Sequence, residues 1–148
     1  MKKSTVGLLV GAGAILAWFF RGRFFGQTYV RPITLKMKAG RCGIDQEPER
    51  VDLSKFRDDT LLWEISNPTT TGCAGQHEVC IGNWRLHGVP TNVPPVTNPQ
   101  GLCRRIGQGN PAIPIVARIN RHAAFGEYEY DILVDDMVVQ DPIVKLTP

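Results

Sequence analysis

The sequence predicts an all-β fold, a sandwich of about seven strands, preceded by a single transmembrane helix. Residues 5–20 form an uncharged apolar run. Several later segments alternate apolar and polar residues with the period of two that marks a half-buried strand. Fifteen glycines and eleven prolines punctuate the 148 residues, as short strands joined by many turns require. We therefore expect a membrane anchor over residues 1–25 and one β-sandwich domain over residues 26–148.

The apolar run has the composition of a membrane-spanning helix. Its sixteen residues would extend about 24 Å as a helix, and residues 24–25 lengthen this to about 32 Å if the intervening arginines reach toward the headgroups. A cleaved signal peptide is the alternative, but such a peptide ends at a small-residue site. Here Trp18, Phe19 and Phe20 stand in that position, so the residues favour an uncleaved anchor. The flanking basic residues are Lys2, Lys3, Arg21 and Arg23.

The orientation of the anchor follows from its short N-terminus and from the cysteines. The two basic residues on each side balance one another, so the positive-inside rule does not decide it. Four cysteines in the domain favour an oxidising compartment. We expect a single-pass protein of the inner (cytoplasmic) membrane, with a cytoplasmic N-terminus and a periplasmic C-terminal domain.

Small residues form a stripe along the anchor. Gly7 and Gly11 are four residues apart and Ala14 follows three later, so a second helix could approach closely on that face. This spacing predicts that the anchor packs against helices of other membrane subunits.

The charge of the domain excludes a nucleic-acid partner. Residues 26–148 hold 13 Lys or Arg and 14 Asp or Glu, a net charge of about −1, so the overall charge of +3 comes from the residues that flank the anchor. We also find no catalytic motif, no phosphate-binding loop and no small-molecule site. The expectation is a protein that is not an enzyme and has no cofactor.

Seven segments carry strand patterns, and in the clearest of them the inward residues are large. They are residues 60–66, with Leu61, Trp63 and Ile65 inward, and residues 127–134, with Tyr128, Tyr130, Ile132 and Val134 inward. Residues 31–38 place Ile33, Leu35 and Met37 on one face, and residues 78–86 place Val79, Ile81 and Asn83 on one face and Trp84 on the other. The remaining segments are residues 51–53, residues 113–119 with Ile113 inward, and residues 137–146, which follow a tight turn at Asp135-Asp136 and contain Pro142.

Residues 88–114 are the least regular part of the domain. A loop of this length without its own secondary structure is functional or disordered. We expect a docking loop, because its prolines lower the cost of ordering it on a partner. The prolines concerned are Pro90, Pro94, Pro95, Pro99 and Pro111.

The four cysteines allow three disulfide pairings, and two structural disulfides are expected in an exported domain. Our choice is Cys73 with Cys80 and Cys42 with Cys103. The alternative is a metal site, since two thiols and two imidazoles lie within fifteen residues. Its ligands would be Cys73, His77, Cys80 and His87, although their spacing matches no standard zinc finger. His122 is expected in an exposed loop.

An acidic stretch lies near the C-terminus, without Lys or Arg between His122 and Val144. Because its carboxylates alternate with inward tyrosines, a solvated strand face is the simplest interpretation. A contact with a basic patch on a neighbouring protein is the more specific one. Its members are Glu127, Glu129, Asp131, Asp135, Asp136 and Asp141.

A further pattern of single residues resembles the cupredoxin family. The matching positions are Pro48, Val51, Leu53, Asp58, Leu61, Trp63, Asn67, His77, Gly126, Tyr128 and Tyr130. The resemblance implies a Greek-key sandwich whose first copper-binding histidine would be His77. The chain departs from the family where the copper cysteine would stand, at Ile132, and near Asp135, where a second histidine is expected; Met137 lacks the partners of an axial ligand. The resemblance thus implies a sandwich without the copper site.

Together these features predict a non-catalytic accessory subunit of a bacterial membrane energy-transducing complex, a photosynthetic reaction centre with its antenna or a respiratory complex, braced on the periplasmic side. Its partners would be other subunits and the lipid bilayer. The alternative is a membrane-tethered copper-binding or electron-transfer metalloprotein that uses the cysteine and histidine cluster.

Overall fold

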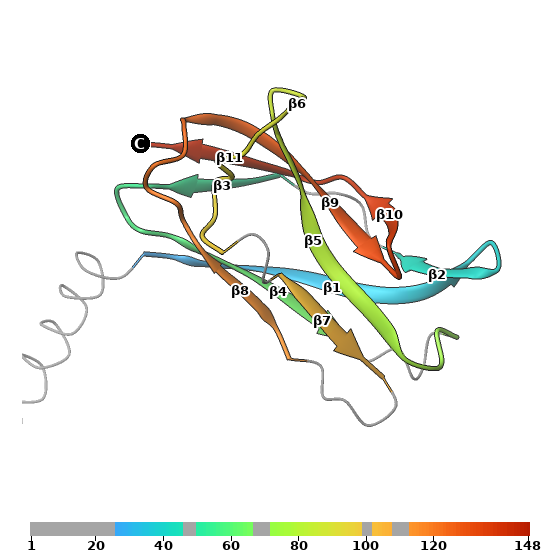
Figure 1. Ribbon diagram of the computed structural model, residues 1–148. Helices are drawn as coiled ribbons and strands as arrows, with labels where there is room; N and C mark the ends of the chain where they lie inside the picture. Colours follow the sequence, from blue (N-terminus) through green and yellow to red (C-terminus); the bar gives the residue numbers. More distant parts are fainter. Residues whose placement is uncertain (1–25, 46–49, 67–71, 99–101, 108–112) are drawn as a thin grey trace, which may run out of the picture.

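The computed structural model describes residues 26–45, 50–66, 72–98, 102–107 and 113–148, and in these residues the fold is all-β. Two sheets pack face to face as a sandwich (Figure 1). The described part of the chain contains no helix that is long and apolar enough to cross a membrane. The predicted anchor over residues 1–25, with Gly7, Gly11 and Ala14, lies outside the described residues.

The first sheet has four strands in the order β2-β1-β4-β8. Its longest strand, β1, pairs in parallel with β4 and antiparallel with β2. The strand β8 pairs antiparallel with β4 and forms one edge. The bounds are β1 (Thr28–Lys38), β2 (Arg41–Ile44), β4 (Thr60–Ser66) and β8 (Ile115–Arg118).

The second sheet has seven strands, built on the order β3-β11-β9-β5-β6. Two short strands lie off this path, because β10 pairs with β9 and β7 with β5. The first strand, β3, pairs in parallel with the last, β11. The bounds are β3 (Arg50–Ser54), β5 (His77–Leu86), β6 (Val89–Pro90), β7 (Cys103–Ile106), β9 (Gly126–Val134), β10 (Met137–Gln140) and β11 (Ile143–Thr147).

The core contains the aromatic residues that the alternation predicted. Trp63 on β4 and Tyr130 on β9 are fully buried and meet edge to face, with ring centroids 5.8 Å apart. Trp84 on β5 stacks on Tyr130 at 4.6 Å. Aromatic pairs in these geometries add about 0.5–1.5 kcal/mol beyond the burial of their area. Trp63 and Trp84 are therefore core residues, as expected.

The predicted face of β5 is wrong beyond Gly82. The pairing of β5 with β9 shifts between Gly82 and Arg85, which marks a β-bulge. Asn83 lies at the bulge with φ of +52° and is exposed, whereas Trp84 turns into the core. The extra residue exchanges the two faces, and a strict period of two cannot anticipate that exchange.

Strand ends account for two smaller corrections. Met37 was expected inward on β1 and Ile113 inward before β8, but both side chains are exposed. Met37 is the penultimate residue of β1, and Ile113 precedes the first residue of β8. Among the described residues the strands number eleven rather than about seven. The additional ones are β2, β6 and β7, and the predicted last strand is divided by Pro142 into β10 and β11.

In its described part, the segment over residues 88–114 has secondary structure of its own, contrary to the expectation, while its docking role stays a prediction. The segment contributes β6 and β7, and both pair with β5. Pro94 and Pro95 are buried, and Val96 makes a bridge to Ile119 beside the edge strand β8. The segment therefore covers a sheet edge that would otherwise offer unpaired backbone groups. Pro90 is exposed, and Pro99 and Pro111 lie outside the described residues.

Two disulfides are present, as predicted, but the predicted pairing is wrong. Cys42 is bonded to Cys73, and Cys80 to Cys103. Cys80 and Cys103 are direct register partners on β5 and β7, so their side chains meet across neighbouring strands. The other bond links β2 of the first sheet to the buried Cys73, which precedes β5 of the second. Proximity through the sheets, and not distance along the chain, decides the pairing.

Candidate functional site

Four segments meet at the end of the sandwich where the first described strand begins. These are the start of β1, the turn between β3 and β4, the connection from β8 to β9 and the end of β11 (Figure 1). A hollow of about 480 Å³ opens at this end. Its lining residues are Lys55, Phe56, Arg121, Phe125 and Pro148. We call this surface the entry-end surface.

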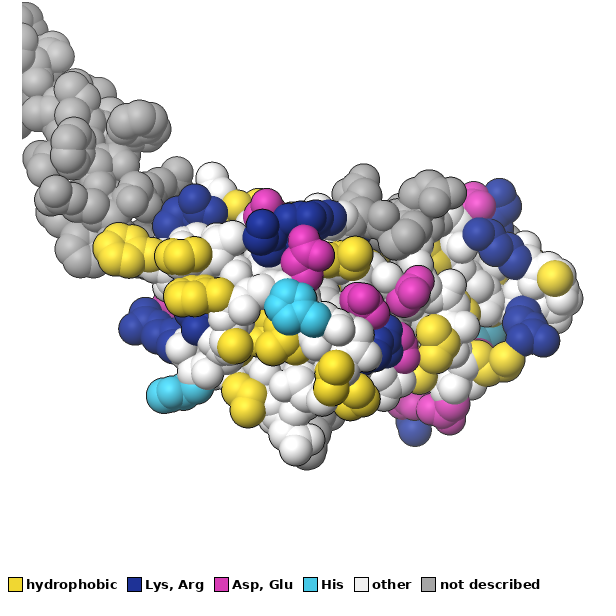
Figure 2. All heavy atoms as spheres, turned by 90° about the horizontal axis from the view of Figure 1, so that it is seen from above, with side chains coloured by type: hydrophobic (Ala, Val, Ile, Leu, Met, Phe, Trp, Pro, Cys, Tyr) yellow, Lys and Arg dark blue, Asp and Glu magenta, His cyan; other side chains and the backbone are white. Residues whose placement is uncertain are grey.

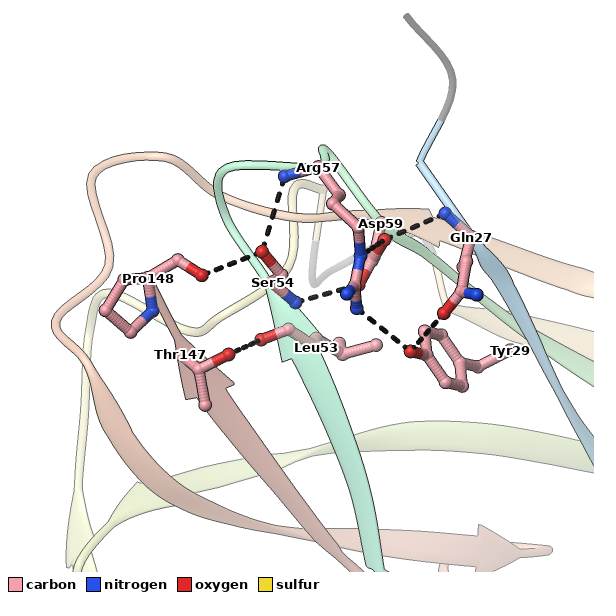
Figure 3. A network of polar contacts seen from close by, with 8 residues as sticks. All are labelled: Gln27, Tyr29, Leu53, Ser54, Arg57, Asp59, Thr147 and Pro148. Carbon is pink, nitrogen blue, oxygen red and sulfur yellow. Dashed lines mark hydrogen bonds and ion pairs between the residues drawn. The ribbon is translucent and has the colours of Figure 1, made fainter. Parts of the chain in front are cut away.

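The entry-end surface is supported by a buried carboxylate. Asp59 is fully buried and accepts hydrogen bonds from the backbone N–H groups of Gln27 and Ser54, each at 2.8 Å (Figure 3). Arg57 donates to the same carboxylate from Nε at 3.2 Å and from Nη2 at 2.9 Å. One side chain thus fixes the first residues of the domain to the turn that follows β3.

The network reaches the end of the chain as well. Ser54 Oγ donates to the carbonyl oxygen of Pro148 at 2.7 Å, and Thr147 Oγ1 donates to the carbonyl oxygen of Leu53 at 3.0 Å (Figure 3). Tyr29 donates to Gln27 Oε1 at 2.7 Å and accepts from Arg57 at 3.1 Å. The entry residues, the turn and the last strand are therefore one connected unit.

The electrostatics of Asp59 are set by two opposing effects. Burial by itself raises the pKa of this carboxyl, but the hydrogen bonds from Arg57, Ser54 and Gln27 outweigh it, and the pKa lies below its usual value. The group is therefore a charged, fully paired structural carboxylate. Each of its two oxygens already accepts two hydrogen bonds, so nothing here indicates a role in acid–base chemistry.

Aromatic rings and cations lie together on the outside of the entry-end surface. Phe56 is 94 % exposed at the tip of the turn, and Phe125 is 54 % exposed. The Lys55 ammonium lies 4.4 Å from the centroid of the Phe125 ring and donates to the carbonyl oxygen of Ala123. Arg121 pairs with Asp58 at 3.4 Å. Figure 2 shows hydrophobic and basic side chains next to one another at the left end of the domain.

The predicted metal site is not formed by the residues proposed for it. Cys73 and Cys80 are each bonded to another cysteine, so neither sulfur is available as a thiolate. His87 lies in the turn after β5, close to the backbone of Gly126. In the described residues there is no group of three or more His, Cys, Asp or Glu side chains arranged to hold a metal.

Two of the positions that the resemblance aligns with copper ligands do come together. His77 Nδ1 lies 2.7 Å from Asp135 Oδ2. Met137 points elsewhere, since its sulfur accepts a hydrogen bond from Arg41 at 3.6 Å, and Ile132 is buried in the core. The result is an acid–imidazole pair and not a set of copper ligands.

The pair of His77 and Asp135 fastens a hairpin. Asp135 Oδ1 accepts from the backbone N–H of Glu78 at 2.9 Å, and the N–H of Asp135 donates to the carbonyl of Glu78 at 2.9 Å. Burial raises the pKa of Asp135, but the bonds from His77 and Glu78 bring it below its usual value. An oriented imidazole also occurs in catalytic sites, where a nucleophile lies beside it. The small hollow here is lined by Gln76, His77, Glu78, Arg105 and Asp135, which include no hydroxyl or thiol nucleophile.

The acidic stretch is largely paired within the domain. Glu127 lies 2.7 Å from Arg50, and Arg85 contacts Glu129 at 3.4 Å and Asp131 at 2.8 Å. Asp131 is buried, contrary to the expected solvated face. Four of its six members, Glu127, Glu129, Asp131 and Asp135, are therefore paired within the domain, and the contact with a basic patch stays a prediction. His122 is exposed in a loop, as predicted.

A row of apolar side chains crosses the outer face of the first sheet. Val30 on β1 is in register with Leu62 on β4, which is in register with Val116 on β8. Val30 is 51 % exposed and Val116 is 52 % exposed, with Leu62 half-buried between them. The solvated face of such a sheet is ordinarily polar. We call these three residues the apolar row.

Sequence reasoning did not find the entry-end surface or the apolar row. A signal for the first was present, because Phe56 stands in an otherwise polar turn between Lys55 and Arg57. The second could not be found without knowing which strands are neighbours. No protein-family model matches the chain, and a search of curated proteins finds no relative.

Proposed function

We propose that this protein is a non-catalytic accessory subunit, tethered to a membrane by residues 1–25, that braces neighbouring subunits through the sandwich. The observation that carries the proposal is the apolar row. Contiguous apolar side chains that stay exposed on a small domain are typical of interaction sites, and the apolar row presents three of them in register. Val30 is four residues beyond Gly26, so the row lies at most about 13 Å along the extended chain from the start of the domain. A neighbouring membrane subunit that projects slightly from the bilayer would meet it.

The compartment is part of the same proposal. Two disulfides and no free cysteine suit an exported domain, where thiols are oxidised. The uncharged run over residues 5–20 supplies the tether. We place the domain in the periplasm and the N-terminus in the cytoplasm.

The host complex is proposed from architecture and resemblance alone. We infer a relation to the cupredoxins and a Greek-key arrangement, supported by the pairing of His77 with Asp135 at two positions that the resemblance singles out. A tethered periplasmic sandwich related to electron carriers fits a photosynthetic or respiratory energy-transducing complex. The metalloprotein alternative is weakened, because Cys73 and Cys80, its proposed thiolate ligands, are both in disulfides.

The test is native electrophoresis of detergent-solubilised membranes from the source cells, with an antibody against the domain. The protein is expected to migrate within a large complex. Val30→Asp with Val116→Asp should release it as a small species, because two buried carboxylates would be left unpaired at the contact. Val89→Asp with Val138→Asp is the matched control, since both valines are exposed but lie on the second sheet.

Two results would contradict the proposal. One is that the unmodified protein migrates alone, and the other is that both double variants leave the complex intact. Metal analysis of the purified protein tests the alternative, and stoichiometric copper would favour it.

A further inference from the structure

We propose that the entry-end surface rests on the phospholipid bilayer, with Phe56 and Phe125 in the headgroup region and Lys55 and Arg121 beside the phosphates. This inference rests on the tether of the proposed function. It adds which end of the sandwich meets lipid, and through which side chains.

The predicted tether joins the described domain without an intervening linker. The apolar and aromatic residues of the tether run to Phe25, and only Gly26 separates Phe25 from Gln27. Two residues span at most about 7 Å. If the tether ends at the membrane interface, the entry-end surface around Gln27 must lie at that interface too.

Gln27 and the turn after β3 are rigidly connected. The N–H of Gln27 donates to Asp59, and its carbonyl accepts from the N–H of Thr60 at 2.8 Å. Gly26 packs so closely on the turn that an added Cβ would lie 2.2 Å from the carbonyl oxygen of Asp58. The turn that displays Phe56 is thus fixed to the point where the tether arrives. The domain cannot turn this end away from the membrane by flexing between Gln27 and the turn.

The side chains of the entry-end surface suit contact with lipid. Phe56 is 94 % exposed at the tip of a turn, so nearly all of its ring is in contact with water. Moving that ring among headgroups and acyl chains would remove apolar surface from water, which is favourable. Phe125 adds a second ring, and basic side chains stand next to both. Aromatic and basic residues in this combination are typical of membrane interfaces. The membrane partner is therefore the lipid surface itself, on a different face from the apolar row.

The experiment uses the full chain reconstituted in vesicles of phosphatidylcholine and phosphatidylglycerol. All four native cysteines are in disulfides, so one introduced cysteine takes a nitroxide label selectively. Phe56→Cys is the test position. Val138→Cys, exposed on β10 toward the other end of the sandwich, is the control. Flotation of the vesicles is measured first, and accessibility of the label to oxygen and to a water-soluble nickel chelate second.

The expected result is that both labelled proteins float and that the nickel chelate reaches position 56 several-fold less than position 138. Equal access at the two positions in floating vesicles would overturn the lipid contact and leave the tether intact. Failure to float would overturn the tether and this inference together. Phe125→Cys is a second test position, and it must show the same protection if Phe56→Cys misfolds.

Discussion

Trp63 and Tyr130 join the two sheets of the sandwich by a hydrogen bond through the core. The indole Nε1–H on β4 donates to the hydroxyl oxygen on β9 at 3.1 Å, and both side chains are fully buried. Burial raises the pKa of Tyr130, so the hydroxyl stays neutral over the physiological range and remains available as an acceptor. The hydrogen bond therefore fixes the relative orientation of the two rings, in addition to their hydrophobic packing.

Tyr130→Phe should destabilise the domain by about 1–3 kcal/mol, because it leaves the buried Trp63 Nε1–H without its acceptor. Urea unfolding followed by tryptophan fluorescence measures this. Tyr29→Phe is the control, since it removes an exposed hydroxyl and should cost less than about 1 kcal/mol. If both variants lose the same free energy of unfolding, the buried hydrogen bond contributes no more to stability than the exposed one.

Peptide mapping of the unreduced protein should recover Cys42 linked to Cys73 and Cys80 linked to Cys103. Trypsin alone leaves Cys73 and Cys80 in one peptide, because no Lys or Arg lies between them, but cleavage after Glu78 separates them. Recovery of Cys73 linked to Cys80, or of Cys42 linked to Cys103, would contradict the fold described. Replacing either pair by serine should cost about 3–4 kcal/mol, as closure of loops of 31 and 23 residues implies.

The stability of the domain should fall in acid through Asp59. Its pKa is lowered in the folded state, so its stabilising effect is complete above the unfolded value of about 3.9 and is lost as the pH falls through the lower folded value. Asp59→Asn should therefore reduce stability near neutral pH, by about 2 kcal/mol, and flatten the acid limb. Urea unfolding at a series of pH values between neutral and strongly acid gives both quantities. Asp52→Asn, at an exposed carboxylate, is the control; an equal response there would refute the role of Asp59.

Asn83→Gly should be more stable than Asn83→Ala, by about 1 kcal/mol, because the residue has φ of +52°. Both variants lose the hydrogen bond to Asp131, so their difference isolates the backbone conformation. Thermal unfolding of the two proteins measures it. At the exposed Glu64 on β4 the order should reverse, with alanine the more stable, since that backbone is extended. The same order at both positions would contradict the bulge.

The sequence predicted the strands whose inward residues alternate without interruption. Residues 60–66 and most of β9 follow the expected pattern, because each packs one face on the opposite sheet along its length. The face of β5 was predicted only up to Gly82, because a bulge adds one residue without leaving a signal in hydrophobicity. Alternation of apolar and polar residues indicates which side chains are buried, but it does not reveal a β-bulge in the pairing of two strands.

Features that depend on neighbouring strands could not be predicted. The partner of Cys42 depends on where β2 lies relative to residue 73, and the apolar row depends on the register of three strands. Asp59 looks like an ordinary turn carboxylate, yet one of its donors is the N–H of Gln27, 32 residues earlier. Such contacts join segments far apart in sequence, and one sequence alone does not say which segments meet.

The hydrogen bond from Ser54 to Pro148 has a practical consequence for anyone who labels or purifies the protein. It holds Pro148 at the entry-end surface, beside the start of β1, so a fusion joined directly to Pro148 would lie against that surface. The turn at Ala39 and Gly40, at the far end of the eleven-residue β1, is open, and an added Cβ on Gly40 meets nothing within 4 Å. An affinity tag or fluorophore inserted there would project into solvent, away from the entry-end surface.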